Sequence, residues 1–424
     1  MPLDSTKHPF YWGVANSAFQ VEGSPAPSDW NDFCQSPGHI KDGSNADHAC
    51  DFWHRYEEDI SLAEELGCRA FRISIAWERI EPDEGRFDEA ALKHYQKIIE
   101  CIRSKGMEPF VTLHHFVWPL WLAESDGPLR PDFASIFARY ADKVVRALVP
   151  KVRFWMSFNE ANVLVHHAYN EGLWPPNHKG RLSEALKALA HMAEAHIQAV
   201  QVLEDLRPQI FWGVAHHVRD FQLPEQAGPI DRSMRFITDW VFNRQFIRAL
   251  NGHIRLWFPG AIPCIRNIHL PTNFRSLDFI GINYYGRLIV RSILKPPFLE
   301  AVEGPGTKTD LDWEVYPQGL SHVLQDFYKR FQLPLIVTEN GLADKNDRLR
   351  ADFIDQHLAE LHLAKKRGVD LLGYLHWSLT DNFEWAEGLE PRFGLVEIDY
   401  ENGAQRKPRP SFRHYKRLIQ SFEY

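Results

Sequence analysis

The sequence reads LIVTENG at residues 335–341, RADFIDQHLAELHLAKKR at 350–367 and LLGYLHW at 371–377. The first and last segments are short apolar runs of strand length, and the middle one has the spacing of an amphipathic helix. Gly368 follows the helical pattern directly, at the position where helices favour a terminating glycine. A strand, a helix and a second strand in this order predict a parallel sheet.

The same alternation recurs along the whole chain. Other helical patterns end at Gly67 and Gly106, and no fixed-period repeat or Gly/Ser-rich linker divides the sequence. We therefore expect one α/β domain over residues 1–424, built as a (β/α)8 TIM barrel with elaborated loops at the carboxyl ends of its strands. The eight predicted strands lie at 11–19, 68–75, 109–115, 152–158, 211–217, 277–283, 335–338 and 371–377.

Composition and charge exclude several classes of protein. The 424 residues are 44% hydrophobic and 25% charged, which is typical of a globular chain. A formal net charge of −8 offers no overall attraction to nucleic acids or anionic membranes, and no apolar run reaches the roughly 18 residues of a membrane span. The five cysteines are scattered without CxxC spacing, and the amino-terminal residues show no secretory pattern. We expect a cytoplasmic protein with no nucleic-acid or membrane partner, and a homo-oligomer stays open.

Polar side chains stand at the ends of the predicted strands, where a barrel built only for stability would carry Val, Ile and Leu. The longer irregular stretches, 22–49, 294–312 and 380–407, follow the first, sixth and eighth strands and should lie at the same carboxyl-end face. Converging amide, imidazole, carboxylate and indole groups predict a polyhydroxylated ligand. The residues are Gln20, Arg72, His114, His115, Asn159, Glu160, Asn283, Tyr284, Tyr285, Thr338, Glu339, Asn340 and Trp377.

Two glutamates stand out among these residues. Glu160 and Glu339 each follow an apolar run and are flanked by asparagine, in FNE at 158–160 and TEN at 338–340. Glycoside hydrolysis uses such a pair, because one carboxyl group must protonate the leaving oxygen while the other attacks or stabilises the oxocarbenium centre. One such glutamate alone would favour a helix cap or an ion pair, but the pair within this set of residues favours catalysis.

The longer motifs resemble those of glycoside hydrolase family 1, the retaining β-glucosidase-like enzymes, over nearly the whole chain. TENG followed about forty residues later by WSLTDNFEW is the most specific part of this resemblance. The matching segments are NSAFQVEG at 16–23, FRISIAWERI at 71–80, TLHHF at 112–116, FNE at 158–160, DFIGINYY at 278–285, WEVYPQGL at 313–320, TENG at 338–341 and WSLTDNFEWAEGLEPRFGL at 377–395.

The resemblance implies hydrolysis in two displacements through a covalent glycosyl-enzyme, with Glu160 as general acid/base and Glu339 as nucleophile. In a retaining enzyme the two carboxyl groups should lie about 5–5.5 Å apart. Arg72 is implied to hold Glu339 ionised, and Tyr285 to donate a hydrogen bond to it. Repulsion by an ionised Glu339 would raise the pKa of Glu160.

The resemblance also implies the sugar contacts. Gln20, His115, Glu384 and Trp385 would bind hydroxyl groups of the nonreducing sugar, and Asn159 would contact its 2-hydroxyl. Trp377 would form the stacking floor, and Trp313 resembles the aromatic residue of the aglycone side. Asn283, at the end of the sixth predicted strand, is assigned to the same substrate site.

The sequence departs from the family pattern at four positions. Ala161 replaces the usual proline after the acid/base glutamate, and Phe116 replaces a tryptophan beside the sugar-binding His115, which leaves the preferred glycone open. Asn162 and His217 replace the usual tryptophan and asparagine, so the aglycone side is expected to be unusual.

Two branches of the family are disfavoured. Glu384 stands where the phospho-glycosidases carry serine, and its carboxylate would repel a sugar 6-phosphate. Plant thioglucosidases lack the acid/base glutamate that is present here as Glu160. The expected activity is therefore an exo-acting β-glucosidase, with β-galactosidase or β-fucosidase activity beside it, on a small carbohydrate substrate.

Other classes of function remain as alternatives. Transglycosylation would use the same glycosyl-enzyme, and a noncatalytic sugar-binding barrel would need neither glutamate. The histidine pairs at 114–115, 166–167 and 216–217 lack metal-ligand spacing, so metal catalysis is the weaker hypothesis and 166–167 are expected on a helix. No nucleotide-binding glycine motif occurs, and we expect neither a cofactor nor a metal.

Overall fold

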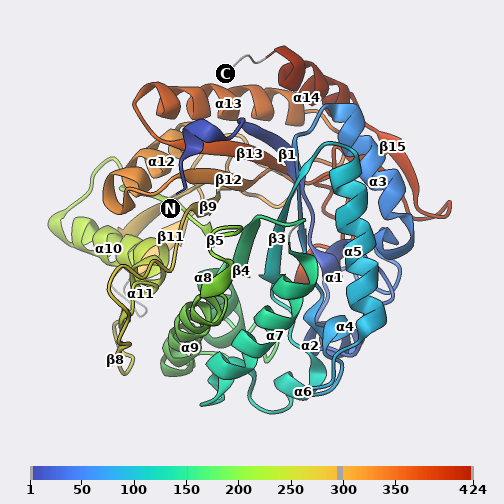
Figure 1. Cartoon of the computed structure of the whole chain (residues 1–424). Coiled ribbons are helices and arrows are strands. Elements are labelled where there is room, and N and C mark those ends of the chain that lie inside the picture. The colour runs from blue at the N-terminus through green and yellow to red at the C-terminus, as the bar shows by residue number, and fades with distance from the viewer. Residues whose placement is uncertain (1–2, 150, 294–298, 422–424) are drawn as a thin grey trace.

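The computed structural model describes residues 3–149, 151–293 and 299–421. Eight parallel strands close into a barrel in the order β1-β13-β12-β9-β5-β4-β3-β2, with helices packed around it, so the predicted TIM barrel is confirmed (Figure 1). The barrel strands are β1 Tyr11–Ala15, β2 Ala70–Ser74, β3 Glu108–His114, β4 Phe154–Asn159, β5 Phe211–His217, β9 Ile280–Asn283, β12 Leu335–Asn340 and β13 Leu371–Trp377.

All eight predicted strands are present, but the first was predicted too long. It ends at Ala15, because the chain turns into helix α1, Ala18–Val21. The Ala18 N–H at the start of this helix donates to Ser74 Oγ at 2.7 Å, a contact with a residue 56 positions away. Gln20 therefore lies on a short helix beyond the strand end.

Helices connect successive strands and cover the outside of the barrel. The glycines predicted to end helices, Gly67, Gly106 and Gly368, follow α3, α5 and α13 with positive φ angles. The longer helices are α3 Phe52–Leu66, α5 Glu89–Ser104, α7 Phe133–Leu148, α9 Leu182–Val202, α10 Pro229–Asp239, α12 Gln318–Phe331, α13 Arg350–Lys366 and α14 Pro410–Ser421. The shorter ones are α2 Asp29–Gln35, α4 Trp77–Ile80, α6 Leu120–Ala123, α8 Ala161–Val165 and α11 Gln245–Ala249, with single helical turns at η1 Ser5–Lys7, η2 Gly127–Leu129, η3 His166–Asn170, η4 Glu204–Leu206, η5 Trp240–Arg244 and η6 Trp385–Glu387.

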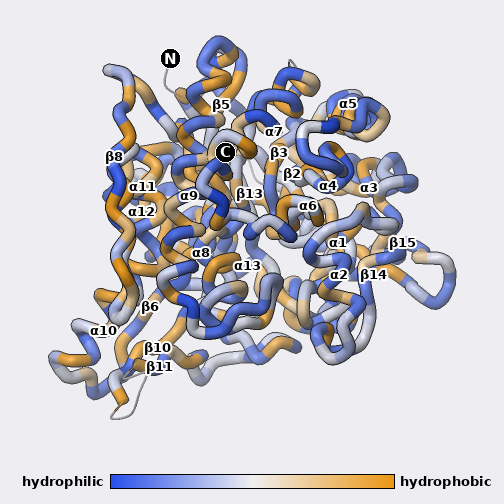
Figure 2. The backbone as a smooth tube through the Cα atoms, turned by 90° about the horizontal axis from the view of Figure 1, so that it is seen from below, coloured by the Kyte–Doolittle hydropathy of each residue, from blue (hydrophilic) through white to orange (hydrophobic). Residues whose placement is uncertain are grey.

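Small sheets outside the barrel elaborate the connections. A three-stranded sheet has the order β11-β10-β6, and two hairpins pair β7 with β8 and β14 with β15. Both views place β8 and β11 on the opposite side of the molecule from α2 and β15 (Figures 1 and 2). These strands are β6 Asp220–Gln222, β7 His253–Leu256, β8 Cys264–Asn267, β10 Arg287–Ser292, β11 Leu299–Val302, β14 Val396–Asp399 and β15 Gln405–Pro408.

The barrel has an inner and an outer core, because side chains alternate between the two faces of each strand. Tyr11, Phe110 and Phe154 belong to an inner cluster, which also contains Tyr285 and Trp377. Their neighbours along the strands pack outward against the helices. The inner cluster therefore extends to the carboxyl ends of the strands, where it meets the polar side chains of the predicted site. None of the helices in the described part of the chain has the length and apolarity needed to cross a bilayer.

Candidate active site

Strand β12, which contains Glu339, and strand β4, which Glu160 follows, are both irregular at their carboxyl ends. In β12, Val337 pairs with Ile282 and Glu339 with the next residue, Asn283, so Thr338 is an extra residue. The pairing of β4 with β5 shifts in the same way between Met156 and Asn159. Such bulges change the direction in which the following side chains point.

Close packing fixes the backbone beside each glutamate. Glu160 itself has φ 43° and ψ 51°, a left-handed conformation that is costly for a residue with a side chain. After Glu339, Gly341 packs so closely on the Trp377 carbonyl that a Cβ atom there would overlap it. The glycine of TENG is therefore required by the approach of two neighbouring strands.

Arg72 connects Glu339 to Asn159 at the centre of the barrel mouth. Its Nη1 donates to Glu339 Oε1 at 2.5 Å, and its Nη2 donates to Asn159 Oδ1 at 2.8 Å. Tyr285 Oη donates to the other oxygen of Glu339 at 2.7 Å. The predicted contacts of Glu339 with Arg72 and Tyr285 are therefore both present, from β2 and from the residues after β9.

Asn283 completes the connection to Glu160. Its Nδ2 donates to Glu160 Oε1 at 2.7 Å and to Asn159 Oδ1 at 3.1 Å. Thr338 Oγ1 donates to Asn283 Oδ1 at 2.6 Å and so fixes the orientation of the amide. Glu160, Asn283, Asn159, Arg72 and Glu339 thus form one continuous hydrogen-bonded chain.

Burial controls the protonation of the two carboxyl groups. Glu160 and Glu339 are 6% and 3% exposed. Burial raises the pKa of Glu160 to about 7, and the Asn283 hydrogen bond and the charge of Arg72 oppose this. Burial also raises the pKa of Glu339, while Arg72 and Tyr285 stabilise its charged form. The sequence predicts repulsion by Glu339 as the cause of the raised pKa of Glu160, whereas the structure gives burial as the cause.

Gln20 and Glu384 form a second polar group beside the pair. Gln20 Nε2 donates to the Phe383 carbonyl at 2.9 Å and lies 3.3 Å from Glu384 Oε2. Burial, reinforced by the charges of Glu339 and Glu160, raises the pKa of Glu384 to about 8. Gln20, which follows β1, and Glu384, which follows β13, therefore meet at the carboxyl-end rim of the barrel, as the sequence predicts.

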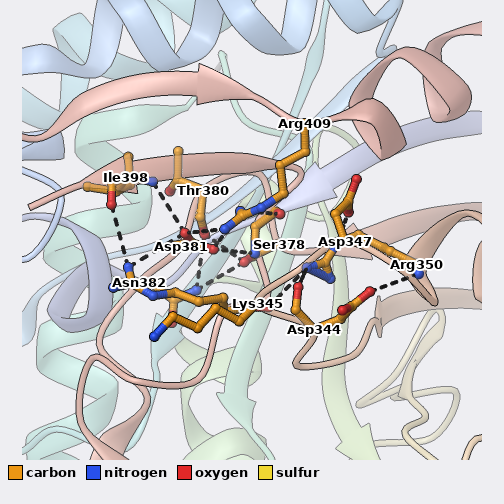
Figure 3. Close-up of polar contacts among 12 residues, drawn as sticks. Asp344, Lys345, Asp347, Arg350, Ser378, Thr380, Asp381, Asn382, Ile398 and Arg409 are labelled. Atoms are coloured by element: carbon orange, nitrogen blue, oxygen red, sulfur yellow. Dashed lines mark hydrogen bonds and ion pairs between the residues drawn. The ribbon is translucent and has the colours of Figure 1, made fainter. Parts of the chain in front are cut away.

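A buried network of charged and polar side chains supports the loop that follows β13, the eighth barrel strand in chain order (Figure 3). Arg409 Nη1 and Nη2 donate to the two oxygens of Asp381, each at 2.9 Å, and both residues are buried. Asn382, the next residue, accepts from Gln20 Nε2 at 3.0 Å. Arg350 supports the neighbouring loop through the carbonyls of Leu342 and Asp344. Sequence reasoning did not identify this network, because its members are far apart in the chain.

Aromatic and imidazole rings lie beside these polar groups. His115 lies nearly parallel to Trp377 and Trp385, with ring centroids 6.1 and 6.0 Å apart. Asn159 Nδ2 lies 3.1 Å from His115 Nε2, which connects these rings to the carboxylate pair. His115 Nδ1 is buried and has no hydrogen-bond partner among the described residues. A bound hydroxyl group could provide that partner.

Trp313 lies beside Tyr285, the residue that donates to Glu339. Its ring packs edge-on against Tyr285 at 5.6 Å, and the Arg219 guanidinium lies 5.5 Å from its centroid.

The two unusual residues of this side, Asn162 and His217, serve different purposes. His217 Nδ1 lies 3.1 Å from Glu160 Oε1, a contact that sequence reasoning missed. Burial lowers the pKa of His217 well below its usual value, so the ring is neutral. Asn162 Nδ2 instead donates to the His217 and Phe242 carbonyls. Asn162 therefore supports the backbone beside the site.

Comparisons with known proteins show the family of the chain. The family model of glycosyl hydrolase family 1 matches residues 4–423. Beta-glucosidase A of Thermotoga maritima is 33% identical over 418 residues, covering 92% of each chain. The structure of a beta-glycosidase from Pyrococcus horikoshii superposes with a TM-score of 0.88 at 35% identity, covering 99% of this chain and 96% of that one. A Thermotoga maritima beta-glucosidase in complex with azafagomine gives a TM-score of 0.87 at 29% identity, covering 97% of each chain.

The barrel and its polar mouth define a glycoside hydrolase that acts on O-glycosyl bonds. The chain belongs to glycosyl hydrolase family 1, and it is a β-glycosidase.

Proposed function

We propose that the protein is an exo-acting retaining β-glycosidase, with Glu160 as general acid/base and Glu339 as nucleophile. The observation that carries this proposal is the buried hydrogen-bonded chain from Glu160 through Asn283, Asn159 and Arg72 to Glu339. It gives the two carboxyl groups different partners, an amide on one side and a guanidinium on the other. Different partners are what a donor of protons and a nucleophile require.

Hydrolysis proceeds in two displacements. In the first, Glu339 forms a bond to the anomeric carbon while the bond to the aglycone oxygen breaks and Glu160 gives that oxygen its proton. In the second, Glu160 takes a proton from water, the water oxygen bonds to the anomeric carbon, and the ester bond to Glu339 breaks. The mechanism requires the two carboxyl groups about 5–5.5 Å apart.

The first displacement requires that Glu160 is protonated while Glu339 is ionised, so the two glutamates hold one proton between them. Arg72 and the Tyr285 hydroxyl both stabilise negative charge on Glu339. Glu160 has no guanidinium in direct hydrogen-bond contact, and its burial favours the protonated form. We assign the proton to Glu160 in the free enzyme.

Polar and aromatic side chains at the barrel mouth bind the glycone. Gln20, His115, Glu384 and Trp385 bind sugar hydroxyls, Asn159 and Asn283 lie toward the 2-hydroxyl, and Trp377 stacks on the sugar ring. Trp313 contacts the aglycone. We favour glucose as the glycone, with galactose and fucose also accepted, because the relatives from Thermotoga maritima are named beta-glucosidases. We also propose that residues 1–424 act as one domain in the cytoplasm.

A panel of p-nitrophenyl β-glycosides tests this proposal, each assayed with wild type and with Glu339→Gln. The panel contains the glucoside, galactoside, fucoside, xyloside, mannoside and glucoside 6-phosphate. Activity on the glucoside that the substitution abolishes supports the proposal and ranks the sugars. Folded wild-type protein that hydrolyses none of them would favour a sugar-binding protein instead.

The raised pKa of Glu160 predicts the pH dependence. The carboxyl must be protonated to act as an acid, and burial extends the protonated form from an ordinary value of 4.5 up to about 7. We expect kcat/KM for the p-nitrophenyl glucoside to fall about tenfold per unit above pH 7. The Glu160→Gln variant, assayed with a 2,4-dinitrophenyl glucoside, should lose this basic limb. A basic limb that persists unchanged in the variant would assign it to another group.

Phe116 is expected to influence the choice of glycone. Its ring contacts Trp385 and Trp174, with centroids 5.1 and 4.8 Å away. Phe116→Trp adds an indole N–H, and one hydrogen bond of about 1 kcal/mol changes the glucoside-to-galactoside ratio of kcat/KM about fivefold. Phe116→Leu, which adds no donor, is the control. A ratio that moves less than twofold in Phe116→Trp would show that this position does not read the sugar.

A further inference from the structure

Three side chains with metal-binding atoms gather on the segment that follows Glu160 and α8. The ligand atoms of His166, His167 and Glu171 all lie within 4.8 Å of one another. His166 Nε2 is 3.4 Å from Glu171 Oε1, and His167 Nδ1 is 2.7 Å from Glu171 Oε2. Zinc is commonly bound by two imidazole nitrogens and one carboxylate, with a water molecule as the fourth ligand.

An unusual helical turn creates this cluster. Residues His166–Asn170 form the π-helical turn η3, in which the Glu171 N–H donates to the His166 carbonyl at 3.0 Å. In an α-helix, residues five positions apart point about 140° apart around the axis. The wider π turn brings His166 and Glu171 to the same side. Such turns occur frequently at functional sites.

The backbone beneath the cluster is held in place by the returning chain. The N–H groups of His178, Gly180 and Arg181 donate to the carbonyls of Ala168, Asn170 and Tyr169 at 2.9, 2.8 and 2.7 Å. Only side-chain adjustments are therefore needed to receive an ion.

The spacing fits a tetrahedral ion. Ligands about 2.1 Å from zinc are separated by about 3.4 Å along a tetrahedron edge, which is the separation of His166 and Glu171. His167 Nδ1 lies 2.7 Å from the other oxygen of Glu171, Oε2, and no two of the three ligand atoms are more than 4.8 Å apart, so shifts of about 1 Å bring all three to one ion. The three side chains are 29–40% exposed, which leaves them room for these shifts. Asn170 Nδ2 lies 3.3 Å from His166 Nδ1. When Nε2 binds the ion, Nδ1 carries the proton, so the Asn170 amide orients the ring by turning its Oδ1 to accept from Nδ1.

We propose that His166, His167 and Glu171 bind a divalent transition-metal ion of the zinc class. The site lies outside the catalytic pair but close to it. His167 packs on Trp174, with ring centroids 4.6 Å apart. The Trp174 ring lies 5.8 Å from that of Trp385, one of the residues proposed to bind the sugar. The ion would clamp the segment 166–171 beside the mouth of the barrel.

Zinc binding to the untagged, chelator-treated protein tests the proposal, measured by competition with a chromogenic zinc indicator. Wild type should bind one equivalent, and His166→Gln and Glu171→Gln should each weaken binding at least about tenfold. His178→Gln is the matched control, because His178 and Glu184 form another exposed pair of the same kind, 3.0 Å apart. The control should bind zinc like wild type.

A second readout separates binding from folding. Zinc should raise the midpoint of thermal unfolding of wild type and of His178→Gln but leave that of Glu171→Gln unchanged, since only an ion bound to the native state stabilises it. Asn170→Ala keeps all three ligands and should weaken zinc binding about tenfold. The proposal is wrong if wild type binds no zinc below millimolar concentration, or if His166→Gln and Glu171→Gln bind it as tightly as wild type.

Discussion

Replacing Glu339 by alanine is expected to lower kcat for a p-nitrophenyl β-glucoside at least about a thousandfold, because the variant lacks the carboxylate that we propose as the nucleophile. Arg72 and Tyr285 donate to the carboxylate but carry no nucleophile of their own in this position. Glu160 stays in place as the acid, so the variant keeps half of the reaction machinery.

Azide or formate should restore part of this lost activity. The truncated side chain leaves a space beside Arg72, whose positive charge attracts a small anion. The anion forms the new bond to the anomeric carbon from the face that Glu339 occupied, and the aglycone leaves with the proton of Glu160. Product analysis by NMR should show an α-glycosyl product, with inverted configuration.

Glu339→Gln is the matched control for this experiment. Its amide abolishes the nucleophile but fills the same volume, so the activity should be lost without rescue by either anion. If no small anion rescued Glu339→Ala, or if the product kept the β configuration, Glu339 would not be the nucleophile.

Replacing Glu160 by alanine should have an effect that depends on the leaving group. For phenyl β-glucoside, whose oxygen needs a proton to leave, we expect kcat/KM to fall about 100- to 10,000-fold. For 2,4-dinitrophenyl β-glucoside the fall should be small, because this aglycone leaves as an anion. The comparison measures the acid role separately from binding, since both substrates carry the same sugar.

Azide distinguishes this variant from Glu339→Ala. It needs no general base, so it should accelerate breakdown of the glycosyl-enzyme in Glu160→Ala and give a β-glycosyl azide with retained configuration. His217→Asn, which changes a contact of Glu160 but keeps the carboxyl, is the control and should show no such acceleration. Equal losses across the two leaving groups would contradict the acid role of Glu160.

Much of the fold could be predicted from local sequence patterns. Each barrel strand is a short apolar run, and the glycines after α3, α5 and α13 marked helix ends. The error at the first strand has a tertiary cause. Residues 16–19 read NSAF, and the predicted strand runs through them to Phe19, but the chain begins a helix at Ala18, whose N–H donates to Ser74 Oγ. A contact across 56 residues leaves no local signal.

The candidate site was predictable for a related reason. In a parallel barrel all strands end at one rim, so polar residues in or just after separate strands, such as Arg72, Glu160 and Glu339, must meet. The same argument could not find His217 as a partner of Glu160, or the support of the eighth loop by Asp381 and Arg409. Those contacts depend on side-chain directions and on chain segments that pack from behind.

The sequence by itself determined the barrel, the rim and the residues that reach it, because periodicity and chain order are local properties. The tertiary structure decided how those residues face one another. Bulges in β4 and β12 redirect the strand ends, and burial raises the pKa of Glu160. A π-helical turn places His166 beside Glu171. Register, burial and helical pitch arise only when distant segments pack together, and for that reason no local pattern records them.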